Sequence, residues 1–270
     1  MNKLKDSWNE GDPYEYFMGR WSKLVAREFL AWLKVPENLT WLDIGCGTGV
    51  LGEAIFTYSK PKQLFSIDPS EGFLARAKAR LNGKGEFMLG HVSELPFEND
   101  VFNIVVSGLA LNFFEDISSS LAEMKRVSKS NGLISAYVWD YSGRIDLLRY
   151  FWDTVISIDP QSHHLDEGVR FPICNSENLE KAFIKAGLTD VTVTTLDIVT
   201  VFNDFEDYWN PFLGGQGPAP SYLASLSEDS KEELRNRIFN KLPIESNGLI
   251  KLLGRAIAIK GKSKEINNFT

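Results

Sequence analysis

The chain has 270 residues, of which 43% are hydrophobic and 24% charged, a composition typical of a folded globular protein and not of a disordered or fibrous one. Its net charge of −7 disfavours nucleic-acid binding, which needs clustered lysine and arginine. No apolar stretch approaches the roughly 18 residues that span a bilayer, no signal peptide is apparent, and two cysteines are too few for a disulfide framework, so we expect a cytoplasmic protein that acts on a small molecule.

Strand and helix patterns alternate along the first half of the chain. Apolar residues at three- and four-residue spacing predict a helix over Trp21–Leu33, ahead of a first strand at Thr40–Ile44. Such alternation predicts an α/β fold with a parallel sheet and helices on both faces. The further strands are expected at Gln63–Ile67, Glu86–Leu89, Phe102–Ser107 and Leu133–Val138, with helices at Val50–Tyr58, Gly72–Leu81 and Asp116–Ser128.

The second half is less regular. Asn203–Leu226 is rich in Asn, Pro and Gly and indicates an irregular connection, in which Pro211–Pro220 is either a mobile flap or a plain surface loop. Periodicity predicts helices at Arg144–Ile158, Ser176–Ala186 and Ser227–Leu242, and strands at Asp190–Val201 and Ala256–Lys260.

The strongest functional signal is the segment Trp41-Leu-Asp-Ile-Gly-Cys-Gly-Thr-Gly49 between the first strand and the next helix. Its glycines allow positive φ and a close approach of the backbone to a ligand, with helix N-terminal amides facing it. Asp68 ends the next strand, 19 residues after Gly49, where a carboxylate can accept hydrogen bonds from both hydroxyls of a ribose. Together these features predict an adenosine site. Because Gly47–Gly52 also fits the dinucleotide fingerprint, an oxidoreductase that binds NAD(P) or FAD is an alternative.

Four segments, in order, resemble the motifs of class I S-adenosylmethionine-dependent methyltransferases. Asp43–Gly49 resembles the first motif, Ile67–Ser70 the second, Gly90–Phe97 the third and Phe102–Ser107 the fourth. The resemblance is closest to the branch that includes the ubiquinone- and menaquinone-biosynthesis methyltransferases. It implies a doubly wound, Rossmann-like sheet of seven strands that ends in an antiparallel hairpin, with helical insertions.

The resemblance also implies how the chain is organised. Residues 1–270 would form one methyltransferase domain. Its parts would be a cap helix at 14–35, a cofactor-binding core at 40–140, an insertion or lid with the substrate region at 141–250, a terminal strand at 256–260 and a tail at 261–270.

Carried over position by position, the resemblance implies an S-adenosylmethionine site. The glycine turn would line the methionine and ribose with support from Asp43, Asp68 would hold the ribose hydroxyls, and Pro69 and Val92 would flank the adenine. Ser107, Leu109 and Asn112 lie where this fold places ligands, beyond the carboxyl end of a strand. The full set at the cofactor is Tyr16, Arg20, Asp43, Gly45, Cys46, Gly47, Gly49, Asp68, Pro69, His91, Val92, Ser93, Ser107, Leu109 and Asn112.

Two positions depart from the family pattern. His91 stands where an acidic residue usually accepts a hydrogen bond from the adenine amino group, and a neutral imidazole can accept through only one ring nitrogen. Ser93 or a backbone carbonyl could serve instead. Asn103 replaces an aspartate, a change that we assign to the start of the strand and not to catalysis.

The N-terminal segment resembles the cap over the cofactor in this branch. Arg20 would pair with the cofactor carboxylate, because a guanidinium binds a carboxylate bidentately, unless it is a surface arginine that begins a helix. Tyr16 and Trp21 would face the sulfonium or, alternatively, pack the helix.

Methyl transfer from a sulfonium has a good leaving group, so the protein mainly aligns the acceptor, and no catalytic residue is assigned. If the acceptor needs a base, the candidates are His91, Asp140 and the pair His163 and His164, whose alternative is a solvated loop. No metal site is expected. The sequence thus predicts an S-adenosylmethionine-dependent methyltransferase with a small-molecule acceptor, and a catalytically inactive cofactor-binding protein is the third alternative.

Overall fold

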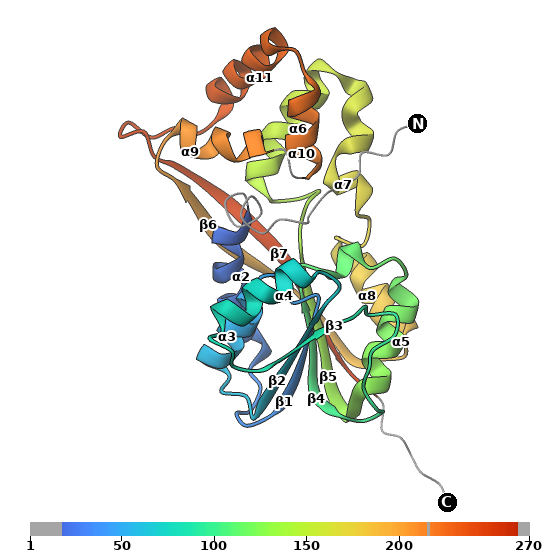
Figure 1. The fold of residues 1–270 in the computed structure, drawn as a ribbon. Coiled ribbons are helices and arrows are strands. Elements are labelled where there is room, and N and C mark those ends of the chain that lie inside the picture. The colour runs from blue at the N-terminus through green and yellow to red at the C-terminus, as the bar shows by residue number, and fades with distance from the viewer. Residues whose placement is uncertain (1–17, 215–216, 264–270) are drawn as a thin grey trace, which may run out of the picture. The chain divides into compact units, whose positions relative to one another are not determined.

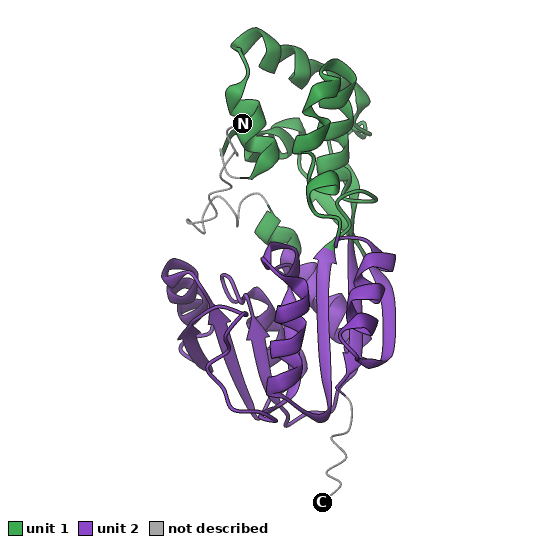
Figure 2. Cartoon of the chain, turned by 90° about the vertical axis from the view of Figure 1, so that its right-hand side faces the viewer, with its two compact units in different colours: residues 1–21, 139–172, 197–255 green, residues 22–138, 173–196, 256–270 purple. Residues whose placement is uncertain are grey.

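The computed structural model describes residues 18–214 and 217–263, which form two compact units (Figure 2). The described parts of 22–138, 173–196 and 256–270 make up what we call the sheet unit. Those of 1–21, 139–172 and 197–255 make up the helical unit. Within the two described ranges, no helix is long and apolar enough to cross a membrane.

The seven strands form one sheet in the order β3-β2-β1-β4-β5-β7-β6 (Figure 1). The pairs β1 with β2, β1 with β4, β2 with β3 and β4 with β5 are parallel. The expected seven-stranded, doubly wound sheet is confirmed, and its order reverses between β1 and β4, where such folds bind ligands. The strands are β1 Thr40–Ile44, β2 Gln63–Asp68, β3 Glu86–Leu89, β4 Phe102–Gly108, β5 Ser128–Trp139, β6 Thr189–Phe202 and β7 Ile250–Lys262.

The last strand in the chain, β7, runs opposite to its neighbours, as the resemblance implied. Ser135 Oγ donates to Ile259 O at 2.7 Å, and Ser263 N donates to Gly132 O at 3.0 Å. Since residue numbers fall on β7 as they rise on β5, these strands are antiparallel. β5 begins before its predicted start, because the exposed polar residues Ser130 and Asn131 carry no apolar signal, and β7 extends beyond its predicted bounds at both ends.

Capping residues set the helix starts in the sheet unit. Ser70 Oγ accepts from Phe73 N at 3.3 Å, and the Asp116 carboxylate accepts from Ser118 N at 2.8 Å. Each satisfies an amide that the first helical turn leaves unbonded.

In Figure 1, α2, α3 and α4 lie on one side of the sheet, and α5 and α8 pack side by side on the other. These helices are α2 Arg20–Leu33, α3 Val50–Tyr58, α4 Glu71–Arg80, α5 Ile117–Val127 and α8 Ser176–Lys185.

The helical unit has an aromatic core. The rings of Phe151 and Phe212 stack with centroids 4.7 Å apart, and the Tyr208 hydroxyl donates to Leu147 O at 2.9 Å. These contacts join the helix that carries Phe151 to segments about 60 residues later in the chain. The elements are α6 Asp146–Ile158, η3 Pro160–Leu165, α7 Glu167–Arg170, α9 Phe205–Trp209, η4 Asn210–Gly214, α10 Pro218–Ser225 and α11 Glu228–Lys241.

The expectation of an irregular segment over Asn203–Leu226 is wrong, since it contains α9, η4 and α10. Asp204 caps α9 by accepting from Asp207 N at 2.8 Å. Pro218 occupies the first turn of α10, directly after Gly217 with φ +88°, so proline and glycine here begin a helix where they were expected to break one.

A buried carboxyl ties α7 to α6. Trp152 Nε1 donates a short hydrogen bond to Glu167, whose side chain is fully buried, and Arg149 forms an ion pair with Asp166 at 2.5 Å. Burial raises the pKa of Glu167 to about 7. The native helical unit therefore binds a proton at this carboxyl more tightly than the unfolded chain does.

We predict that Glu167→Gln weakens the pH dependence of stability. The pKa of Glu167 is 4.5 in its ordinary state and about 7 in the fold, so the stability that the bound proton contributes is complete below pH 4.5 and is lost as pH rises through 7. Urea unfolding at pH 5 and pH 8 should show a smaller loss of unfolding free energy for the variant than for the wild type. Equal losses would contradict the assignment.

Candidate functional site

The glycine turn after β1 folds over the end of β2. Gly45 N and Cys46 N both donate to Ile67 O, at 2.8 and 3.1 Å, and Gly49 N donates to Cys46 O at 2.9 Å. Gly45, Gly47 and Gly49 have φ of +68°, +52° and +83°, which L-residues with a Cβ rarely adopt. The loop conformation therefore depends on its glycines.

Asp68 joins the loop after β1 to the loop after β2. Its Oδ2 accepts from Gly47 N and its Oδ1 from Ser70 N, both at 2.9 Å, and the residue is 5% exposed. Burial raises the pKa of Asp68 above its ordinary value, and the hydrogen bonds from these two amides offset part of that rise. Each carboxylate oxygen has a second lone pair, so Asp68 can still accept hydroxyl donors.

Asp43 contributes differently from what the resemblance implied. It is fully buried between Ser66 of β2 and Val106 of β4, and neither carboxyl oxygen accepts a hydrogen bond from the part of the chain that the structure describes. The turn is held by Ile67 O and Asp68, and not by Asp43. Burial is the main cause that raises the pKa of Asp43 to about 8, and the negative charge of the nearby Asp68 is the second.

Cys46 is a free, buried thiol in the same turn. Burial, and then the charges of Asp43 and Asp68, raise the pKa of its thiol well above the ordinary value. A thiol that stays protonated is a poor nucleophile, so these surroundings do not activate Cys46 for attack on a substrate.

The turn after β4 lies against the glycine turn. A Cβ added to Gly45 would lie 2.6 Å from Ala110 Cβ. Leu109, at φ +58°, is held there by its N–H bond to Tyr137 O at 2.8 Å. A non-glycine residue in this region costs about 1 to 3 kcal/mol, and such strain is common at ligand sites.

Two buried polar side chains, at the end of β4 and in the turn after it, each have an atom without a hydrogen-bond partner among the described residues. Ser107, at the end of β4, is 0% exposed, and Asn112, in the short helix η2 Leu111–Phe113, is 9% exposed. Neither Ser107 Oγ nor Asn112 Nδ2 makes a hydrogen bond within residues 18–214 and 217–263. Buried polar groups nearly always have partners, so these atoms and the Asp43 oxygens have hydrogen-bonding capacity left for a ligand or for water.

The residues present fit a ligand that carries a ribose and an amino acid. A Cβ on Gly47 would meet nothing within 4 Å, so the turn borders open space there. Asp68 can accept from hydroxyls, the unpaired Asp43 oxygens can accept from an ammonium, and the Ser107 hydroxyl and Asn112 amide can donate to a carboxylate. In the described part of the chain, no group of three metal-ligating side chains is placed to hold an ion.

The loop after β3 carries the residues expected at the adenine. His91 Nδ1 accepts from Ser93 N at 3.2 Å and lies 2.8 Å from Ser93 Oγ, while Val92 is buried and Pro69, after β2, is exposed. In a neutral ring whose Nδ1 accepts, the proton is on Nε2, which is then a donor. This geometry does not offer the adenine amino group an acceptor at His91.

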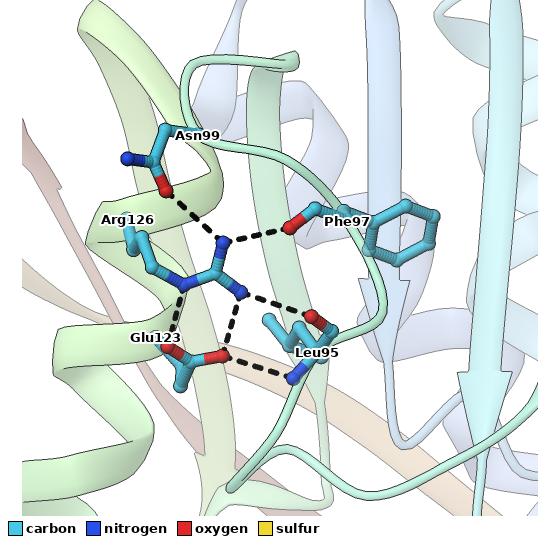
Figure 3. Close-up of polar contacts among 5 residues, drawn as sticks. All are labelled: Leu95, Phe97, Asn99, Glu123 and Arg126. Atoms are coloured by element: carbon cyan, nitrogen blue, oxygen red, sulfur yellow. Dashed lines mark hydrogen bonds and ion pairs between the residues drawn. The ribbon is translucent and has the colours of Figure 1, made fainter.

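Arg126 fixes this loop, and sequence reasoning missed it. From the last turn of α5, its guanidinium donates to Leu95 O at 2.9 Å, Phe97 O at 2.7 Å and Asn99 Oδ1 at 3.1 Å (Figure 3). Glu123 pairs with Arg126 at 2.6 Å and also accepts from Leu95 N at 2.9 Å. The only signal in the sequence was a basic residue at a helix C-terminus, which is ordinary on electrostatic grounds.

Arg20 has a protein partner within the helical unit. Its guanidinium pairs with Asp207 at 2.7 Å and lies over the rings of Trp21 and Phe202, at 4.3 and 4.8 Å from their centroids. Trp21 packs edge-on against Phe202, as its helix-packing alternative requires. Tyr16 lies outside the described residues. The cofactor roles of Arg20 and Tyr16 stay predictions.

The candidate bases have local structural contacts. The Asp140 side chain folds over Gly143, whose added Cβ would lie 2.1 Å from Asp140 Oδ2, and burial raises the pKa of Asp140. His164 Nδ1 lies 2.7 Å from Gln161 O, and His163 and His164 are both exposed.

Asn103 Oδ1 accepts from Thr40 N at 3.1 Å, which supports its assignment to the strand start.

Comparison with known proteins gives one family model, described as a methyltransferase domain, that matches residues 42–136. A demethylmenaquinone methyltransferase of Leptospira interrogans is 33% identical over 141 residues, which are 49% of this chain and 56% of the relative. The biotin biosynthesis bifunctional protein BioHC of Saccharophagus degradans is 32% identical over 113 residues, which are 40% of this chain and 19% of the relative. The chain thus spans less than two thirds of either relative.

Solved structures share the fold. The YcgJ protein of Bacillus subtilis has a TM-score of 0.57 at 19% identity, covering 91% of this chain and 99% of that one. Phosphoethanolamine N-methyltransferase 2 of Haemonchus contortus, in complex with S-adenosylhomocysteine, has a TM-score of 0.55 at 15% identity, covering 94% of this chain and 56% of that one.

We predict that Gly45→Ala destabilises the protein more than Gly47→Ala. Both substitutions place a Cβ on a residue with positive φ, which costs about 1 kcal/mol. Only the Gly45 variant also forces a contact, 2.6 Å from Ala110 Cβ, for which we expect about 1 to 3 kcal/mol more. Chemical denaturation measures both, and equal losses would show that the two turns are not packed together.

We predict that Arg126→Gln loosens the loop after β3. The variant loses charge-assisted bonds to two carbonyls, and we expect the unfolding free energy to fall by about 1.5 to 3 kcal/mol. Hydrogen exchange of residues 91–99 should rise. The matched control is Arg237→Gln, since Arg237 forms an exposed helix pair with Glu233. Similar effects of both variants would contradict the anchoring role.

Proposed function

We propose, from the match of residues 42–136 to a methyltransferase domain model, that the protein transfers a methyl group from S-adenosylmethionine to a small-molecule acceptor. The observation that carries this proposal is the join of the glycine turn to Asp68 through the bond from Gly47 N at 2.9 Å. This bond holds a buried carboxylate, which has lone pairs left for hydroxyl donors, beside a backbone turn that borders open space at Gly47.

The described residues suit this cofactor in three parts. Asp68 would accept hydrogen bonds from the ribose hydroxyls. Pro69, after β2, and residues His91 to Ser93, after β3, would flank the adenine. Asp43, Ser107 and Asn112, which have buried polar atoms without a partner among the described residues, would meet the ammonium and carboxylate of its amino acid. Gly45, Cys46, Gly47, Gly49 and Leu109 would shape the backbone around it. When bound, the cofactor supplies an electrophilic methyl group on a sulfonium.

Catalysis would then rest on aligning the acceptor with the methyl group and on excluding water, because none of the described residues is placed as a general base beside the proposed cofactor site. A relative is named for demethylmenaquinone, and a structural neighbour for phosphoethanolamine. These names support a small-molecule acceptor. The net charge of −7 supports the same class over nucleic acid. A cytoplasmic location, and one domain whose residues 141–250 carry the acceptor site, complete the proposal.

Calorimetric titration with S-adenosylhomocysteine, and separately with NAD, tests the proposal. We expect S-adenosylhomocysteine to bind and NAD not to bind. Asp68→Ala should weaken binding about 10- to 100-fold, because hydrogen bonds to a charged group contribute about 1.5 to 3 kcal/mol.

The matched control is Glu71→Ala, which removes an exposed carboxylate three residues away. We expect it to bind as the wild type does. Binding of NAD without S-adenosylhomocysteine would overturn the proposal and favour an oxidoreductase.

A further inference from the structure

Asp43 is a buried acid that has no hydrogen-bond donor beside it among the described residues. It is 0% exposed, and neither of its oxygens accepts a hydrogen bond from any described residue. Asp68, one strand away, is nearly as buried, but its two oxygens accept from Gly47 N and Ser70 N. The two carboxyl groups of the site therefore differ: backbone amides stabilise the charge of Asp68, and nothing in the described chain does so for Asp43.

The groups around Asp43 make its ionised form still less favourable. Asp68 on β2 acts on it as a like charge, and Cys46 in the following turn is a neutral thiol. On the other side, β4 brings Val106 into register with Asp43, followed by Ser107, and neither ionises near neutral pH. An unpaired carboxylate away from water is far less stable than a protonated carboxyl at the same place. The geometry thus favours a proton on Asp43 in the free protein.

A ligand that carries an ammonium would reverse this preference. Its N–H groups would satisfy the bare oxygens of Asp43, and its positive charge would stabilise the carboxylate. A sulfonium brings charge but no hydrogen-bond donor, so the amino group of the cofactor suits Asp43 better than its sulfur does. This step rests on the proposed function, since it takes the ligand to be an adenosylated amino acid.

We propose that Asp43 is protonated in the free protein and releases this proton to solvent when the ammonium of the cofactor's amino acid binds beside it. The O–H bond of the Asp43 carboxyl breaks, the proton passes to the buffer, and an ion pair between carboxylate and ammonium forms. No electron transfer is involved. Cofactor binding is therefore coupled to the release of close to one proton at neutral pH.

The sign of the pH dependence follows from this exchange. Because the free carboxyl has its pKa at about 8, the proton must be removed at lower pH, and affinity should rise as pH increases toward 8. The dissociation constant should fall by up to about tenfold per pH unit between pH 6 and 7.5 and level off above pH 8.

Titration calorimetry of the wild type with S-adenosylhomocysteine at pH 7, in phosphate, HEPES and Tris buffers, tests the proposal. These buffers differ in ionisation enthalpy, so the slope of the binding enthalpy against it gives the number of protons released. We expect a slope close to one proton. An amine that gained a proton on binding would give the opposite sign.

Two comparisons assign the proton to Asp43. Methylthioadenosine lacks the amino acid, so it should bind with no proton release. Asp43→Asn keeps the shape but has no proton to lose, so its slope with S-adenosylhomocysteine should vanish and its affinity should vary less than twofold between pH 6 and 8. If this variant does not fold, the contrast between the two ligands on the wild type still decides.

The outcomes separate the two proposals. Binding of S-adenosylhomocysteine with a slope of zero, or with the same slope as methylthioadenosine, overturns the proton exchange and leaves the proposed function standing. A slope of one proton that persists in Asp43→Asn also overturns it. Absence of binding overturns the proposed function, and the proton exchange with it.

Discussion

The carboxylate of Asp68 is the interaction on which the rest of the site depends. It accepts the amide of Gly47 from the loop after β1 and the amide of Ser70 from the loop after β2, both at 2.9 Å. Ile67 O, one residue earlier, accepts the amides of Gly45 and Cys46. The end of β2 therefore determines the shape of the loop after β1, and a parallel register between the two strands is the condition for that geometry.

Burial has opposite consequences for the two acids of this site. Both are nearly excluded from water, yet backbone amides stabilise the charge of Asp68, whereas Asp43 has no hydrogen-bond partner among the described residues. Such a pair suits a ligand with hydroxyls at one end and an ammonium at the other. Asp68 has lone pairs left for neutral donors, whereas Asp43 lacks both a hydrogen-bond donor and a positive charge beside it. The unpaired Ser107 and Asn112 and the strained Leu109 lie in the turn after β4, which packs against the glycine turn through Ala110.

The sheet was predictable because its strands and helices have short-range signals. Thr40–Ile44, Val50–Tyr58 and Glu86–Leu89 have the predicted bounds, and the resemblance implied the hairpin at the end of the sheet. The Asn- and Pro-rich segment before Leu226 was misjudged, since whether Pro218 begins or breaks a helix depends on tertiary packing. Likewise, the anchoring by Arg126 and the unpaired state of Asp43 depend on residues distant in sequence, and no local pattern encodes them.

Hydrogen exchange of the protein with and without S-adenosylhomocysteine tests the central claim, that one adenosyl amino acid site is formed at the carboxyl ends of β1, β2 and β4. The account predicts new protection in residues 45–49, 68–70 and 107–112, with less change in α5 and α11. Protection by NAD at these residues and none by S-adenosylhomocysteine, or protection by S-adenosylhomocysteine elsewhere in the chain, would contradict it.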